Sequence, residues 1–246
     1  MSLFCKLIEE RNFHNAWAKA IQGVLCCGAD LVIGGEEERK PIKDSCMLIS
    51  LEGKAIKQVE NRELHPQFPT KKAHLDKYCE EYTRDYVGRY LEKPLNERFA
   101  YLYFERLTLY SEYKKSNTVV DQILSLREEL SDKKKLSITS NRDQAITWQV
   151  GPDNETSSPP CLQRIQIRYI PESKVDVHLT WRSRDLFNAW QSNIIAIIDM
   201  LNREVIKPNN CKIARIIDYN DSLHIYKADI EQAKKVKLIP ISPQEI

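Results

Sequence analysis

Residues 161–181 read CLQRIQIRYIPESKVDVHLTW, and this stretch decides the fold. Apolar and polar residues alternate on both sides of a turn at residues 171–174, which is typical of two antiparallel strands joined as a β-hairpin. The apolar face carries Ile165, Ile167, Tyr169, Val175, Val177, Leu179 and Trp181. The opposite face carries Arg164, Gln166, Arg168, Asp176 and His178. The first face predicts a buried core, and the second predicts a surface that meets either water or a second copy of the chain.

Helical periodicity outside the hairpin predicts helices over residues 12–27, 71–91, 119–130 and 186–202. Apolar runs of strand length lie at residues 46–51, 136–139, 145–150 and 211–219, and a short charged helix is expected near the end of the chain. These elements fit a single domain over residues 1–246. We therefore predict an α+β fold in which helices cover one face of a mixed, twisted β-sheet, while the polar hairpin face forms a homodimer interface.

The composition argues against nucleic acid and membrane partners and indicates the cellular compartment. The 246 residues are 42% hydrophobic and 29% charged, as in a soluble globular enzyme, and the net charge of +2 provides no global field to attract a nucleic acid polymer. No run of about 18 apolar residues predicts a membrane span. The seven cysteines form no CxxC pair, and the N-terminus has no signal-peptide h-region, which favours a reduced, cytoplasmic protein.

Reactive side chains gather around the hairpin. Two prolines precede Cys161, and the tetrapeptide Arg182-Ser183-Arg184-Asp185 follows the second strand. A cysteine acts as a nucleophile when its thiolate is stabilised, and Arg182 can do this while its planar guanidinium also holds a phosphate. The alternative for Cys161 is a buried structural thiol.

Two further candidates for ligand binding are an asparagine and a basic loop. Asn193 lies beside the apolar stripe of the helix predicted over residues 186–202. A buried carboxamide without partners costs about 1–3 kcal/mol, so Asn193 serves either the edge of a uracil-like base or a packing or capping position. The mixed-charge loop at residues 34–44 is either a solvated connector or a phosphate clamp that uses Arg39, Lys40 or Lys43.

The ordered motifs resemble the thymidylate synthase and pyrimidine nucleotide hydroxymethylase superfamily, in its short, archaeal-like form. The match consists of Pro160-Cys161, Arg182-Ser183-Arg184-Asp185, Asn193 eleven residues after Arg182, and Asp221-Ser222-Leu223-His224-Ile225-Tyr226. Upstream, it includes Tyr103-Phe104-Glu105-Arg106-Leu107, Asp121-Gln122-Ile123 and Arg142. The resemblance is strong over residues 118–228, and the spacing of the motifs makes it specific.

The resemblance implies a homodimeric enzyme that acts on a pyrimidine mononucleotide and uses 5,10-methylenetetrahydrofolate. Cys161 would add to C6 of the base, and Glu81, or else Glu80, would act as general base. The other implied roles are phosphate binding by Arg182, Ser183 and the Arg142 of a second subunit, base recognition by Asn193, sugar binding by His224 and Tyr226, ordering of nucleotide and folate by Asp185, and a substrate contact by Tyr103.

Three functions stay open at the level of sequence. Thymidylate synthase activity, dUMP to dTMP, is favoured because the amide of Asn193 can pair with uracil. A 5-hydroxymethylase acting on dUMP, dCMP or CMP is the alternative, because Leu162 and Phe104 depart from the family pattern, as Trp181 also does. In addition, the sequence continues for only about twenty residues after Tyr226, too few for the segment that closes over folate in larger synthases. An inactive relative that binds a nucleotide or a protein partner is the third.

Overall fold

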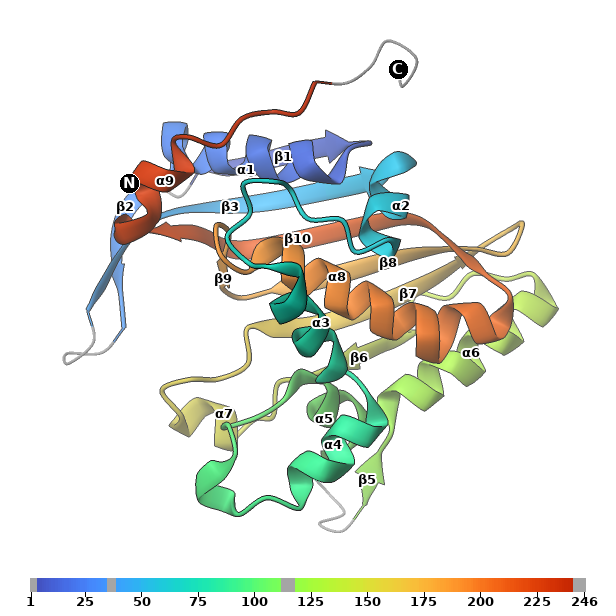
Figure 1. The fold of residues 1–246 in the computed structure, drawn as a ribbon. Coiled ribbons are helices and arrows are strands. Elements are labelled where there is room, and N and C mark those ends of the chain that lie inside the picture. Colours follow the sequence, from blue (N-terminus) through green and yellow to red (C-terminus); the bar gives the residue numbers. More distant parts are fainter. Residues whose placement is uncertain (1–3, 35–38, 112–117, 241–246) are drawn as a thin grey trace.

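The structure, a computed structural model, describes residues 4–34, 39–111 and 118–240. Within these residues an eight-stranded mixed sheet runs in the order β1-β3-β10-β8-β7-β6, with β2 paired to β3 and β9 paired to β10 (Figure 1). The strands are β1 (Cys5–Glu10), β2 (Ala29–Ile33), β3 (Lys40–Glu52), β6 (Gln144–Ile146), β7 (Leu162–Ile170), β8 (Lys174–Trp181), β9 (Arg184–Asp185) and β10 (Lys212–Tyr226). A separate small sheet pairs β4 (Tyr110–Ser111) with β5 (Val119–Val120).

Helices α1 (Phe13–Cys27), α8 (Trp190–Leu201) and α6 (Gln122–Leu136) lie across one face of the large sheet (Figure 1). A π-helix, Asn202–Ile206, continues α8. The other helices are α2 (Lys54–Glu60), α3 (Lys72–Glu80), α4 (Arg84–Leu91), α5 (Tyr103–Thr108), α7 (Pro152–Glu155) and α9 (Ile230–Ala233), with 3-10 turns at Leu95–Glu97, Lys207–Asn209 and Lys227–Asp229. Across the described ranges, we find no helix with the length and apolar character needed to span a membrane.

The predicted hairpin is confirmed as β7 and β8, and its apolar face lies at the centre of the core. Ile165 and Val177 are inaccessible to solvent, as are Ile194 and Ile198 of α8 in the same hydrophobic cluster. Burying each such side chain contributes about 1.5–3 kcal/mol to folding. The predicted α+β fold, a mixed sheet layered with helices, is therefore confirmed.

The polar face of the hairpin turns away from that core. Arg168 is exposed, Arg164 and His178 are half-buried, and Asp176 is buried in an ion pair with Arg215 of β10, where N and O are 2.7 Å apart. Burial lowers the pKa of His178, so this face presents a neutral imidazole among arginines. That the face forms a homodimer interface stays a prediction.

Three predicted helices have different boundaries in the structure. The helix predicted over residues 71–91 is two helices, because Thr83 is extended and its hydroxyl accepts from N of Tyr86 (3.2 Å). The helix predicted over residues 186–202 begins only at Trp190, since Asp185 accepts from N of Asn188 (2.9 Å) and holds the intervening residues in a turn. The helix predicted over residues 119–130 is α6, which Asp121 caps by accepting from N of Leu124 (2.9 Å).

Four strand predictions also need correction. Residues 136–139 form no strand, because α6 runs to Leu136 and Ser137 then takes a left-handed conformation. The strand predicted over residues 145–150 is limited to β6. The last strand continues to Tyr226, and β3 begins at Lys40 instead of residue 46. As a result, His224, Tyr226 and Lys40 are all held by the sheet. Lys43 also belongs to β3, so residues 40–44 of the predicted basic loop are strand, while residues 35–38 lie outside the described residues.

Candidate active site

Strand pairing brings the reactive residues to one end of the sheet. Cys161 directly precedes β7 and Arg182 directly follows β8, and the hairpin register places them side by side, with N of Arg182 donating to O of Cys161 (3.0 Å). β9 pairs with β10 so that Asp185 lies opposite His224. The predicted nucleophile, arginine, carboxylate and histidine are therefore neighbours because of the sheet topology.

The guanidinium of Arg182 lies against the thiol of Cys161. Its Nε donates to O of Pro160 (2.9 Å) and its Nη2 to O of Pro159 (2.5 Å), while Nη2 is 3.8 Å from Sγ of Cys161. The guanidinium thus places a positive charge and an N–H donor beside the sulfur of Cys161. Nη1 has no hydrogen-bond partner in the part of the chain that the structure describes, which leaves its donors available to an anion.

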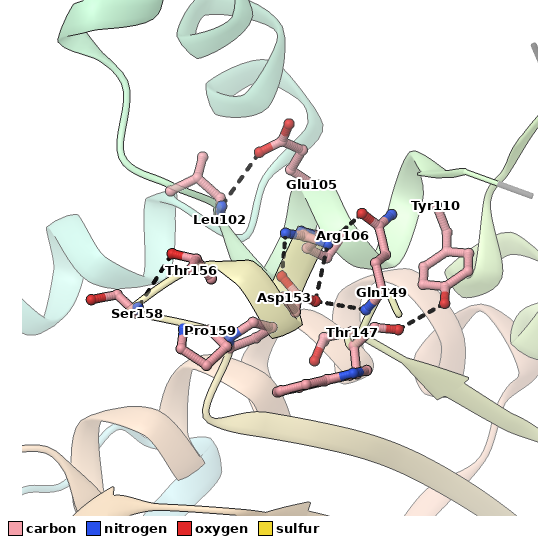
Figure 2. A network of polar contacts seen from close by, with 12 residues as sticks. Leu102, Glu105, Arg106, Tyr110, Thr147, Gln149, Asp153, Thr156, Ser158 and Pro159 are labelled. Atoms are coloured by element: carbon pink, nitrogen blue, oxygen red, sulfur yellow. Dashed lines mark hydrogen bonds and ion pairs between the residues drawn. The ribbon is translucent and has the colours of Figure 1, made fainter. Parts of the chain in front are cut away.

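The loop that delivers Cys161 is anchored by a buried ion pair (Figure 2). Nη2 of Arg106, in α5, donates to Oδ1 of Asp153 (2.9 Å), whose Oδ2 also accepts from N of Gln149 (2.6 Å). The Asp153 side chain is 1% exposed and that of Arg106 13%. Because Asp153 lies in α7, within the loop before Cys161, this ion pair links the nucleophile's loop to α5.

An aromatic cavity of about 390 Å³ lies next to this loop, and Ser158 contributes to its wall. Its other walls come from the ends of α3 and α5 and the segment 99–104 between them, including Glu81 and Tyr103. Burial raises the pKa of Glu81. Its neighbour Glu80 is exposed and is not among the lining residues, so the structure places Glu81, the preferred candidate for the general base, in the cavity.

Tyr103 and Tyr101 complete the wall nearest to the nucleophile. Tyr103 is half-buried and its ring meets Trp181 edge-on, with the centroids 6.0 Å apart. Burial is the main cause that raises the pKa of Tyr101, and its hydroxyl also contacts the backbone of Cys161. Tyr101 did not stand out in the sequence, because it belongs to an aromatic run without a distinguishing pattern.

Asn193 is held from both ends of its amide. Nε of Arg184 donates to Oδ1 of Asn193 (3.2 Å), and Nδ2 of Asn193 donates to the hydroxyl of Tyr78 (2.8 Å). Arg184 is itself paired with Asp218 of β10 (2.8 Å). Neither Arg184 nor Tyr78 was a sequence candidate: Tyr78 fell within an apolar helical stripe, and Arg184 occupies the variable position of its motif.

The histidine on β10 is buried and retains an unpaired ring nitrogen. His224 is 2% exposed, and its Nδ1 lies 3.4 Å from the hydroxyl of Ser222. Its Nε2 has no partner among the described residues, although it is buried. Burial lowers the pKa of His224, partly opposed by Asp44, which lies opposite it on β3. A neutral imidazole with one free nitrogen is suited to a hydrogen bond with a ligand hydroxyl.

The remaining candidates lie around this histidine. The ring of Tyr226 meets His224 edge-on, with the centroids 5.1 Å apart. Burial is the main cause that raises the pKa of Tyr226, and Asp185 raises it further while Lys40 lowers it. Asp185 accepts from N and Nδ2 of Asn188 (2.9 and 3.0 Å), and burial raises its pKa.

The two other candidates for phosphate binding, Ser183 and Arg142, differ in their position relative to Cys161. Ser183 is half-buried between Arg182 and β9. Arg142, in contrast, is exposed and remote from the nucleophile. Its neighbour Asp143 accepts from N of Ile167, six residues along β7 from Cys161, which corresponds to about 20 Å.

The fold and the placed thiol define an α+β protein with a candidate cysteine nucleophile at the end of its sheet. A family model described as Thymidylate synthase matches residues 40–239, and the chain belongs to this family. A Methanopyrus kandleri protein named "Putative thymidylate synthase" is 26% identical over 225 residues, covering 91% of this chain and 94% of the relative. A Methanosarcina mazei protein of the same name is 24% identical over 232 residues, covering 94% of each. The predicted family is thus confirmed.

Proposed function

We propose that this chain transfers a one-carbon unit to C5 of a pyrimidine mononucleotide, and that the reaction is the methylation of dUMP to dTMP. The proposal is carried by the position of Cys161 Sγ, 3.8 Å from Nη2 of Arg182 and at the same sheet end as His224 and Tyr226. Family membership supports a one-carbon transferase. We propose a mononucleotide and not a nucleic acid polymer as the substrate, since the net charge of +2 offers no global field that would attract a polymer.

The nucleophile makes C5 reactive. In the proposed reaction the Cys161 thiolate forms a bond to C6, the C5–C6 double bond breaks, and its electron pair moves toward O4 to give an enolate. C5 of this adduct is a carbon nucleophile, which C5 of the intact ring is not. Arg182 stabilises the thiolate before addition, and when the adduct breaks down the thiolate leaves beside the same positive charge.

The nucleotide is positioned by residues from several strands. Nη1 of Arg182 and the hydroxyl of Ser183 bind the phosphate, Asn193 pairs with the base, and Nε2 of His224 and the hydroxyl of Tyr226 bind the sugar. The orphaned Nε2 supports this assignment, because a buried ring nitrogen without a partner costs about 1–3 kcal/mol unless a ligand satisfies it.

The aromatic cavity suits 5,10-methylenetetrahydrofolate. Its tyrosine and phenylalanine rings match a flat pterin and an aminobenzoyl ring. When bound, the folate would supply both the one-carbon unit and the hydride that reduces it to a methyl group, and it would leave as dihydrofolate. Glu81, whose raised pKa allows it to carry a proton nearer neutral pH, moves protons at the base and the folate. Asp185, with its pKa also raised, orders both ligands, and Tyr103 forms the wall between the cavity and the nucleophile.

The decisive experiment is intact-mass analysis after incubation with 5-fluoro-dUMP and methylenetetrahydrofolate. We expect a mass increase equal to both ligands in the wild type and none in Cys161→Ser. Cys46→Ser removes another half-buried thiol and should leave the increase unchanged. All seven cysteines are free, so the assay is run under the reducing conditions of the cytoplasm, where we propose the enzyme acts. A wild type without the adduct, or an equal adduct in Cys161→Ser, would overturn the proposal.

Product analysis separates methylation from its alternative. With dUMP, dCMP or CMP and methylenetetrahydrofolate, the proposed synthase yields dTMP together with dihydrofolate. A 5-hydroxymethyl nucleotide together with tetrahydrofolate would instead identify a hydroxymethylase. Binding of the nucleotide without turnover would identify an inactive relative.

We further propose that the enzyme is a homodimer joined through the polar face of β7, β8 and β10. Within one subunit, Arg142 is about 20 Å from Cys161 along β7, too far to share a phosphate with Arg182. A second subunit related by a two-fold axis can supply this arginine. An exposed Arg142 would then serve the active site of the neighbouring subunit, which explains why it is one of the matching motif residues. Sedimentation at micromolar concentration should show a dimer, and a monomer would contradict this assignment.

A further inference from the structure

Arg184 is a buried cation in the interior of the protein. Its side chain is 1% exposed, and its partner Asp218 is 0% exposed. The guanidinium is also stacked over Trp181, with Cζ 3.9 Å from the ring centroid. Transferring such a charge from water costs several kcal/mol, so the arrangement persists only if the cation is fully paired.

The pairing uses every side of the guanidinium. Nη1 donates to Oδ1 of Asp218 (2.8 Å), Nη2 to O of Trp190 (3.0 Å), and Nε to Oδ1 of Asn193 (3.2 Å). The second oxygen of Asp218 accepts from Nε1 of Trp190 and from Nδ2 of Asn220, both at 2.8 Å. The ion pair is therefore rigid, and among the described residues its hydrogen bond to a candidate site residue is the one from Nε to Asn193.

This bond fixes the orientation of the Asn193 amide. A guanidinium has donors and no acceptor, so only the oxygen of the amide can face Arg184. The amide nitrogen then faces the hydroxyl of Tyr78, which accepts at 2.8 Å and lies 2.9 Å from the hydroxyl of Tyr82. Burial raises the pKa of Tyr78 to about 12, so its hydroxyl keeps its proton and can donate to Tyr82 while it accepts from Asn193. The hydrogen bonds therefore run in one direction from Arg184 through Asn193 to Tyr78.

A fixed amide distinguishes the two pyrimidines. An amide oxygen accepts two hydrogen bonds and an amide nitrogen donates two, so one acceptor and one donor of Asn193 remain for a base. Uracil presents N3–H as a donor and O4 as an acceptor, which complements this order. Cytosine presents N3 as an acceptor and its amino group as a donor, and it requires the amide to be turned by 180°.

We propose that Arg184 is a positioning residue that holds the Asn193 amide in the orientation that pairs with uracil and rejects cytosine. The inference rests on the proposed function, in which Asn193 contacts the base. In this proposal the choice of base depends on Arg184, which does not contact the nucleotide and occupies the variable position of the motif Arg182-Ser183-Arg184-Asp185.

The test compares the affinities of dUMP and dCMP by titration calorimetry. The ratio of the two affinities is independent of the fraction of protein that is active, so a purely structural role for Arg184 would not change it. We expect the wild type to prefer dUMP at least tenfold. Arg184→Lys keeps the charge, but one ammonium cannot reach the three separate partners of the guanidinium, and we expect the preference to fall to threefold or less.

Arg184→Met combined with Asp218→Asn removes both buried charges together, and it should lower the ratio in the same way. The matched control is Arg62→Lys, which changes an arginine that pairs with Asp76 and Asp199 (3.0 Å each) and should keep the wild-type ratio. If either Arg184 variant folds, as judged by circular dichroism, and retains the wild-type preference, the inference is refuted while the proposed function stands. If the wild type binds neither nucleotide, the proposed function itself fails.

Discussion

The ion pair between Arg106 and Asp153, which anchors the loop before Cys161, should contribute to stability in a way that depends on which partner is replaced. Replacing Arg106 by Met leaves Asp153 charged and 1% exposed, with N of Gln149 as its main remaining donor. Removing one partner of a buried pair costs about 3–5 kcal/mol, and the retained hydrogen bond places the expected loss near the lower end, at about 3 kcal/mol. Asp153→Asn leaves Arg106, which is 13% exposed and can turn its charge toward water. We expect that variant to lose about 1–2 kcal/mol.

Urea denaturation followed by circular dichroism measures both losses as changes in the free energy of unfolding. Arg89→Met provides the control, because its pair with Asp85 has side-chain exposures of 66% and 81% and should contribute less than about 0.5 kcal/mol. Equal losses for Arg106→Met and Asp153→Asn, or a larger loss for Asp153→Asn, would refute the argument that exposure decides which partner is costly to leave unpaired.

Three more predictions concern ionisation and assembly. Because burial raises the pKa of Glu81, the folded state binds more protons than the unfolded state, and stability falls as pH rises through that range. Glu81→Gln should therefore be more stable than wild type at pH 7.5, with the difference vanishing below about pH 4, and Glu80→Gln is the exposed control in the same urea titrations. Burial lowers the pKa of His224, so stability should drop as pH falls below about 6.5, and His224→Gln should flatten that slope; an unchanged slope argues against a buried neutral imidazole. Finally, mixing inactive Arg142→Glu with inactive Cys161→Ser should restore activity through dimers that contain one intact site, whereas a mixture as inactive as its components would contradict a trans role for Arg142.

The sequence predicts the centre of the fold better than its edges. The hairpin at residues 161–181 alternates cleanly because one face is buried and the other is not, and the structure confirms both strands. β1 was missed, since Cys5–Glu10 has a mixed pattern and sits at the edge of the sheet, where pairing with β3 determines its conformation more than its own residues do. The same holds for β2, which pairs, within the described part of the chain, with the early part of β3.

The candidate site was predictable where a residue belongs to a spaced motif. Cys161, Arg182, Asn193 and His224 all come from such motifs, and the sheet places three of them at one end. Their supporting partners were not predictable, because support is a matter of tertiary contact. One signal was present: Asp218 is a charged residue at a core position of an apolar strand, which requires a buried cation elsewhere in the chain.

Arg182 and Arg184 belong to one motif, but their different contacts suit them to different roles. Arg182 is bound to backbone carbonyls and makes no ion pair among the described residues, so its charge remains available to a thiolate or a phosphate. Arg184 is neutralised by Asp218, so its charge has little effect outside the pair and its influence is directional, through Nε. Replacing either by Lys preserves the charge and changes the geometry. Arg182→Lys should therefore slow adduct formation and retain the preference for dUMP over dCMP. Arg184→Lys should lower that preference and leave the rate of adduct formation unchanged, because only this substitution removes the bond that orients Asn193.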